Sequence, residues 1–146
     1  MNFTTAFARF KAKLTNSNWA VSAIAEDGSV VISCWSHYFK PAKNAVLPYV
    51  DSLSRWNGSN VPGNNLLRTH LEQAVAKNLD VRLVIATTND EAAVDRGDDA
   101  SKLSNTFGVR EDLVGRVTQF DGDNFVIEFR RDPKHAAARD RGKRGV

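Results

Sequence analysis

The chain has 146 residues, with 20 Lys and Arg against 17 Asp and Glu, a net charge of +3, and one cysteine. This length fits one domain that can bury a core without stabilisation by a metal ion or disulfides. A single cysteine excludes an internal disulfide. There is no run of about 18 apolar residues and no continuous apolar segment near Met1. We therefore expect no membrane span, no secretory signal and a cytoplasmic protein.

The excess of positive charge is concentrated at the C-terminal end. Residues 130–146 hold seven Lys and Arg against two Asp, a net charge of +5, so residues 1–129 sum to −2. This end has too little apolar content to fold alone, and it either attracts phosphate or serves only as a solubilising terminus. The sequence predicts one domain over residues 1–131 and a basic, disordered tail over 132–146.

The N-terminal third predicts a helix followed by a hairpin. Phe3, Phe7, Phe10 and Leu14 recur at helical spacing, which predicts an amphipathic helix over residues 2–14 that packs on the core. Residues 19–25 and 29–35 are rich in β-branched and aromatic side chains, and Asp27-Gly28 between them favours a tight turn. Val30, Ile32 and Cys34 share one side of the second strand, so we expect Cys34 in the core.

The middle of the chain predicts a short helix, a loop and a longer helix. A helix over residues 46–53 is compatible with Pro48 only if the proline lies in the first turn. Residues 56–64 have the composition of a loop. Asn64 or Asn65 is expected to cap the helix that follows, and the apolar spacing continues to about residue 78.

The last third predicts a central strand and a second hairpin. Residues 80–87 are apolar on both faces, as in a strand covered from both sides. A short helix over 90–96, capped by Asn89, precedes an irregular polar stretch over 98–105. Strands over 113–120 and 124–130 flank Asp121-Gly122-Asp123, and the three-residue loop predicts Val117 opposite Ile127 and Phe125 opposite Gln119.

These elements predict a single α+β domain. Its sheet should have about five strands, mixed or antiparallel and strongly bent, with partial closure into a barrel as an alternative. An N-terminal helix and a central helix accompany the sheet, and the order of the strands stays open.

Residues 35–68, which we call the aromatic segment, predict the functional site. Aromatic, basic and amide side chains gather there in a stretch with weak secondary-structure preference, and long loops often carry binding sites. Aromatic faces stack bases, Lys and Arg meet phosphate, and Asn pairs with base edges. The candidates are Trp35, His37, Tyr38 and Trp56 for stacking, Lys40, Arg55 and Arg68 for phosphate, and Asn57 or Asn64 for a base edge.

This combination predicts a small module that binds nucleic acid or a nucleotide, and we expect no cofactor. An alternative is a protein-interaction or regulatory domain that binds a partner or a second copy through the same aromatic side chains. A third is a Mg²⁺-dependent nuclease that uses Glu128 and nearby acids. Cys34 and His37 form only half of a zinc pattern, and no catalytic motif is present, so we expect neither a metal site nor an enzyme.

Overall fold

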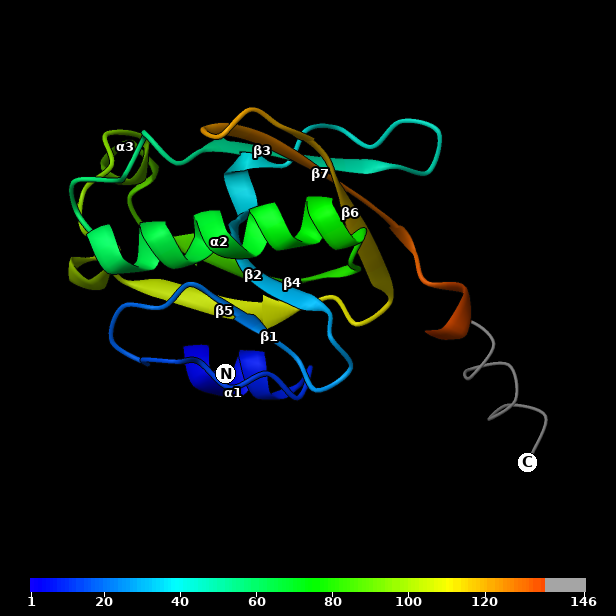
Figure 1. Cartoon of the computed structure of the whole chain (residues 1–146). Helices are drawn as coiled ribbons and strands as arrows, with labels where there is room; N and C mark the ends of the chain where they lie inside the picture. The colour runs from blue at the N-terminus through cyan, green and yellow to red at the C-terminus, as the bar shows by residue number, and fades with distance from the viewer. Residues whose placement is uncertain (136–146) are drawn as a thin grey trace.

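A computed structural model describes residues 1–135 of the chain and shows one seven-stranded mixed sheet with helices on both faces (Figure 1). The strand order is β1-β2-β4-β6-β7-β3, and β5 pairs with β4 outside this path. The elements in chain order are α1 (Phe3–Ala8), β1 (Ser22–Ile24), β2 (Val30–Trp35), the 3₁₀ turn η1 (Ser36–Tyr38), β3 (Leu47–Ser52), α2 (Val61–Lys77), β4 (Val81–Thr88), α3 (Glu91–Asp95), the 3₁₀ turn η2 (Ala100–Lys102), β5 (Asn105–Val109), β6 (Leu113–Phe120) and β7 (Asn124–Arg131).

Strand β4 lies at the middle of the sheet, as its apolar residues predict. It pairs in parallel with β2 and antiparallel with β5, and Val81 meets Gly115 of β6. Leu83 packs in the cluster under α2, whereas Val84 packs in the cluster under α1. Because alternate residues of a strand point to opposite faces, these two clusters cover the two sides of β4.

Both predicted hairpins are present. β1 and β2 pair antiparallel, but β1 begins at Ser22 rather than at residue 19. Residues 17–19 form a turn instead, because the Asn16 side chain accepts the N–H of Asn18 and the Asn16 carbonyl accepts that of Ala20.

The β6–β7 hairpin confirms Val117 opposite Ile127 but corrects the register of its tip. Phe125 lies opposite Phe120, and Gln119 lies opposite Val126. An irregularity between Val117 and Gln119 causes the shift, since a bulge adds one unpaired residue to its strand. Phe125, Ile127 and Phe129 share the buried face of β7 as predicted.

Two strands, β3 and β5, were not predicted from the sequence, so the prediction of about five strands was too low. The expected helix over 46–53 is the strand β3, which pairs with β7. Pro48 is tolerated because β3 lies at the end of the sheet path. The second is β5, which begins at Asn105 where the polar stretch ends. The sheet is open, so the barrel alternative is wrong.

The helix boundaries also need correction. α1 ends at Ala8, and Lys11 has a left-handed φ of 55°, so the predicted helix to residue 14 is too long. Asn60, rather than Asn64 or Asn65, caps α2 and accepts the N–H of Gly63 at 3.1 Å, with a proline in the first turn. The short helix over 90–96 is confirmed as α3, with Asp90 in place of Asn89 as its cap.

The chain contacts the sheet beyond β7 as well. Asp132 is buried and accepts a hydrogen bond from Arg82 of β4 at 2.8 Å. Residues 136–146, which hold most of the predicted basic tail, lie outside the described residues. Within residues 1–135, no helix is both long and apolar enough to cross a bilayer.

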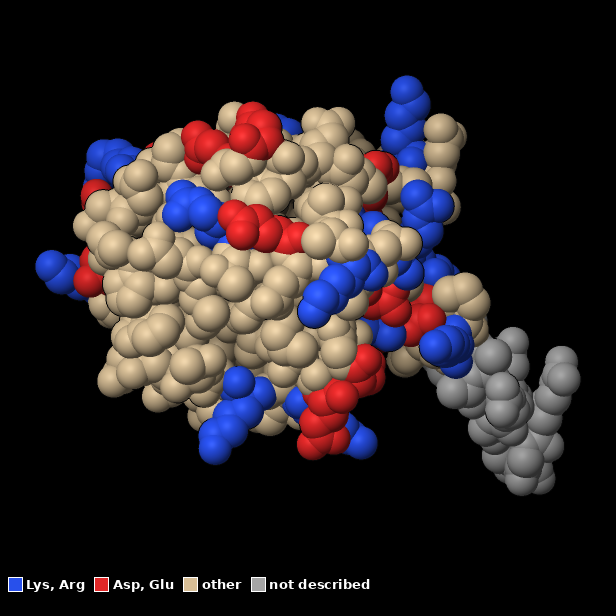
Figure 2. Space-filling view, viewed as in Figure 1, with Lys and Arg blue, Asp and Glu red and all other residues tan. Residues whose placement is uncertain are grey.

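Charge on the face that carries α2 is mixed. Figure 2 shows Lys and Arg interspersed with Asp and Glu around a broad uncharged area, and the view has no continuous basic stripe. α2 itself contributes only Arg68, Glu72 and Lys77 as charged residues.

Gly115 of β6 provides a test of core packing. A Cβ at Gly115 would lie 2.6 Å from the Phe129 ring, so we expect Gly115→Ala to lower the free energy of unfolding by about 1–3 kcal/mol. Gly108 of β5 has nothing within 4 Å of the corresponding position, so Gly108→Ala should be neutral or slightly stabilising. Urea unfolding measures both, and equal effects would contradict this account.

Candidate functional site

All three tryptophans of the chain line one cavity of about 260 Å³, which we call the tryptophan cavity. Trp19 comes from the connection between α1 and β1, Trp35 ends β2, and Trp56 follows β3. Each is half-buried, so the indoles are neither sealed in the core nor fully exposed. Trp56 also packs against the core cluster under α2, and Trp19 packs against the cluster under α1. Among the described residues, Trp35 belongs to neither cluster.

The rest of the cavity wall combines apolar and polar side chains. Its apolar part comes from α1, α2 and α3, from the segment before β1 and from the sheet, and its polar part comes mainly from loops. The apolar lining includes Phe3, Val21, Leu67, Ala86, Val94 and Phe107, and the polar lining includes Ser33, Asp51, Arg55, Asn60, Asp98, Asp99, Ser101 and Asn105.

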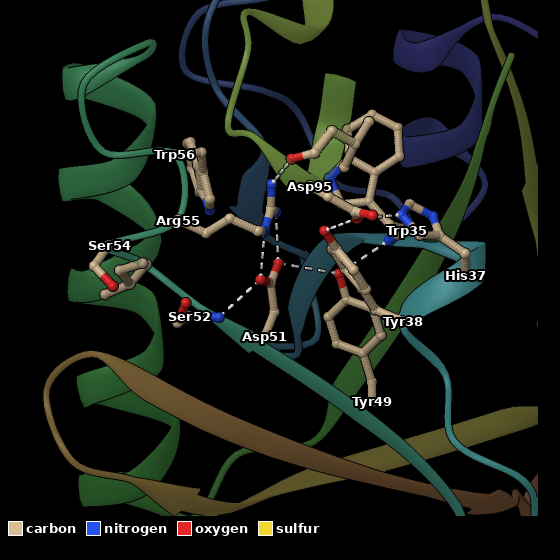
Figure 3. A network of polar contacts seen from close by, with 12 residues as sticks. Trp35, His37, Tyr38, Tyr49, Asp51, Ser52, Ser54, Arg55, Trp56 and Asp95 are labelled. Carbon is tan, nitrogen blue, oxygen red and sulfur yellow. Dashed lines mark hydrogen bonds and ion pairs between the residues drawn. The ribbon is translucent and has the colours of Figure 1, made fainter. Parts of the chain in front are cut away.

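An ion pair between Arg55 and Asp51 forms part of this wall (Figure 3). The guanidinium donates from Nε and Nη2 to the two carboxylate oxygens, each at 2.8 Å, and from Nη1 to the Val94 carbonyl at 2.6 Å. The Arg55 side chain is 14% exposed and that of Asp51 is 7% exposed. The pair therefore ties the loop after β3 to α3 in a mostly desolvated place.

The Asp51 carboxylate is also joined to β2 through Tyr49. The Tyr49 hydroxyl donates to Asp51 at 3.4 Å and accepts the backbone N–H of Trp35 at 3.0 Å. Burial, with a smaller contribution from Asp51, raises the pKa of Tyr49 well above its ordinary value. The hydroxyl thus keeps its proton, and it couples the backbone of Trp35 to the ion pair.

A second polar group joins η1 to α3. Asp95 accepts from the Tyr38 hydroxyl at 2.5 Å and lies 3.1 Å from Nε2 of His37, and these hydrogen bonds lower the pKa of Asp95. The Arg55 guanidinium lies over the Tyr38 ring, 4.9 Å from its centroid, a cation–π geometry. Figure 3 shows Tyr38, Arg55 and Asp51 grouped between Trp35 and Trp56.

Backbone contacts set the distance between the loops around the cavity. Gly97 has a left-handed φ of 78°, and a Cβ there would lie 1.9 Å from the Arg55 carbonyl oxygen. On the other side, the Asn60 side chain that caps α2 donates to the Trp19 carbonyl at 2.8 Å. These contacts fix the chain beside Trp56 and beside Trp19.

The structure brings five of the nine predicted site residues together. Trp35, Arg55 and Trp56 line the cavity, and His37 and Tyr38 join it through Asp95 and Arg55.

The other four lie elsewhere. Lys40 and Asn57 are exposed outside the cavity lining. Asn64 is buried and donates to the Leu53 carbonyl at 2.9 Å. Arg68 donates to Asn65 on the outer side of α2.

Sequence reasoning missed Trp19, Asp51 and Asn60 as parts of the site. For Trp19 the β-rich pattern that follows predicted a strand, which concealed a loop. The Asn60-Val61-Pro62 order is a helix-start signal that identifies Asn60. Asp51 and Arg55 stand four residues apart, a spacing that brings opposite charges together in a helical turn, and this local signal could have identified the pair.

The described residues contain no group of three or more His, Cys, Asp and Glu that could hold a metal ion. Cys34 is fully buried, as the strand pattern predicts, and burial raises the pKa of its thiol. Comparisons of the chain with protein-family models, with curated protein sequences and with solved structures gave no significant match. The functional argument therefore depends on the geometry of the cavity.

The ion pair can be tested by removing one charge. Asp51→Asn leaves the Arg55 guanidinium without its carboxylate, and we expect the free energy of unfolding to fall by about 3–5 kcal/mol. The matched change Asp98→Asn affects the exposed pair with Arg96 and should cost about 1 kcal/mol or less. Urea unfolding compares the two, and a similar cost for both would show that the buried pair does not organise the site.

Gly97 gives a second test of the site. Gly97→Ala adds left-handed strain and a clash with Arg55, so we expect a loss of about 2–4 kcal/mol in unfolding free energy and a changed near-ultraviolet spectrum of the tryptophans. Gly122→Ala adds comparable strain at φ 97° with nothing within 4 Å. If the two variants lose equal stability and Gly97→Ala leaves the spectrum unchanged, the close contact has no structural role.

Proposed function

We propose that the protein binds a ligand carrying a nucleobase, either a nucleotide or an unpaired base of a nucleic acid, and that the base enters the tryptophan cavity. The observation that carries this proposal is that all three tryptophans line one cavity while remaining half-buried. Indole faces stack on any base, and each stacked base contributes about 1–3 kcal/mol. The volume of about 260 Å³ is at the small end for ligand pockets and suits one base or nucleoside.

An adjoining groove offers a place for phosphate. It shares Arg55, Trp56, Ser59, Asp98 and Asp99 with the cavity, and Arg96 and Lys102 add two positive charges that offset the two carboxylates. Arg96 pairs with Asp98, but both side chains are about half exposed, so the pair is weak in water. Arg55 already donates three hydrogen bonds to Asp51 and Val94, which supports a structural role for it rather than the phosphate contact expected from sequence. We therefore assign the phosphate to Arg96 and Lys102.

The alternative functions gain less support. A protein interface anchored by the aromatic segment needs exposed aromatic faces, yet Trp35, Tyr38 and Trp56 are turned partly inward. The large apolar side chains with the greatest exposure are instead Met1, Ile24, Val61 and Val75. For the nuclease alternative, Glu128 lies on β7 between Arg116 and Pro48 of the neighbouring strands, and no described acid cluster accompanies it.

Trp35→Leu tests the proposal, because Trp35 contributes to the cavity without packing in either described core cluster. We expect adenosine monophosphate and a short single-stranded oligonucleotide to change the tryptophan fluorescence of the natural protein. Isothermal titration calorimetry should show binding weakened by about 5- to 150-fold in the variant, the equivalent of one lost stacking contact.

Phe120→Leu is the matched control, since Phe120 packs on the core outside the cavity lining and its loss should leave affinity unchanged. Absence of any fluorescence or heat signal with both probes at low salt would reject the proposal. Equal affinity of Trp35→Leu and the natural protein would reject the cavity as the binding site.

A further inference from the structure

The lining of the tryptophan cavity contains more negative than positive side chains. Asp51, Asp98 and Asp99 contribute negative charge to its lining, and Arg55 is its one cation among the described residues. Arg55 and Asp51 neutralise each other through a bidentate pair. Within the lining, Asp98 and Asp99 therefore remain as the uncompensated charges, and the nearby cations Arg96 and Lys102 line only the adjoining groove.

These two carboxylates are accessible to a ligand. Hydrogen bonds from the hydroxyl and backbone N–H of Ser101 lower the pKa of Asp99. Both bonds reach the same oxygen of Asp99, so its other oxygen is available. Asp98 is paired with Arg96, but both side chains are about half exposed, and such a pair is weak in water.

The aromatic faces of the cavity also attract positive charge. The ring quadrupole places negative potential over the face of an indole, and tryptophan binds cations best among the aromatic side chains. A neutral base gains only stacking from such walls, whereas a base with delocalised positive charge gains stacking, the cation–π term and attraction to Asp98 and Asp99. An anionic group in the same place would be repelled.

We infer that the tryptophan cavity selects a positively charged base, of the kind produced by methylation of a ring nitrogen, over the neutral base. This inference rests on the proposed function and specifies the chemical class of its ligand. The phosphate of such a nucleotide would stay outside the cavity, where Arg96 and Lys102 of the adjoining groove offset the two carboxylates that the groove shares with the cavity.

Two isomeric nucleosides separate charge from size. 1-Methyladenosine carries a delocalised positive charge at neutral pH, whereas N6-methyladenosine has the same heavy atoms and is neutral. Titration of the full chain, followed by tryptophan fluorescence and calorimetry, should give roughly tenfold tighter binding of 1-methyladenosine. Added salt should reduce this preference, because it screens the two partly exposed carboxylates.

The double variant Asp98→Asn, Asp99→Asn tests which groups create the preference. Asparagine keeps an oxygen that can cap η2 at position 99, so the fold is retained while both charges are removed. We expect the ratio of the two affinities to fall to within roughly twofold of one. Asp121→Asn removes a charge in the β6–β7 turn, outside the cavity lining, and should leave the ratio unchanged.

The outcomes distinguish this inference from the proposed function. Equal binding of the two nucleosides overturns the charge selection and leaves the base-binding proposal intact. Binding of neither overturns both. A preference that survives in the double variant overturns the role of Asp98 and Asp99, and binding of tetramethylammonium as tight as that of 1-methyladenosine overturns the requirement for a base.

Discussion

The buried pair of Arg55 and Asp51 is the interaction on which the candidate site depends. Removing two charges from water is costly, and the cost is offset only when the geometry is good and the remaining hydrogen-bonding groups are satisfied. Here the Asp51 carboxylate accepts hydrogen bonds from Nε and Nη2 of Arg55 and from the Tyr49 hydroxyl. It also accepts the backbone N–H of Ser52 at 2.7 Å. Arg55 in turn reaches the Val94 carbonyl. The pair thus holds the loop after β3 against α3.

This pair also determines what the cavity offers a ligand. Since Arg55 and Asp51 cancel each other, they place a polar but uncharged surface between Trp35 and Trp56 (Figure 3). Segments far apart in the chain meet there: β2 with η1, the end of β3, and α3 with the loop that follows it. Under the proposed function, ligand binding and the stability of these contacts would be coupled, because an indole that moves must disturb the hydrogen bonds around the pair.

Short sequence patterns correctly predicted the elements whose structure depends on residues close together in the chain. Asp-Gly turns identified both hairpins, and the two-sided apolar run identified β4. β3 was mistaken for a helix because its strand character depends on pairing with β7, more than seventy residues away in the chain. The site divides in the same way: aromatic composition identified Trp35 and Trp56, whereas Trp19 acquires its place only through a tertiary contact with Asn60. Asp51 pairs with Arg55 four residues along the chain, and the tie of this pair to α3 comes from the bond between Arg55 and Val94.

The distribution of aromatic residues argues for a binding role over a purely structural one. The largest fully buried side chains are Tyr49, Phe7, Phe125 and Phe129, and none of the fully buried side chains is an indole. Burying a large aromatic side chain fully contributes about 1.5–3 kcal/mol, and leaving three tryptophans half-buried around one cavity forgoes part of that stabilisation. A ligand whose flat face covers the exposed indole surface would recover it. Under the proposed function, the same surface that weakens the isolated fold would supply the affinity for a stacked base.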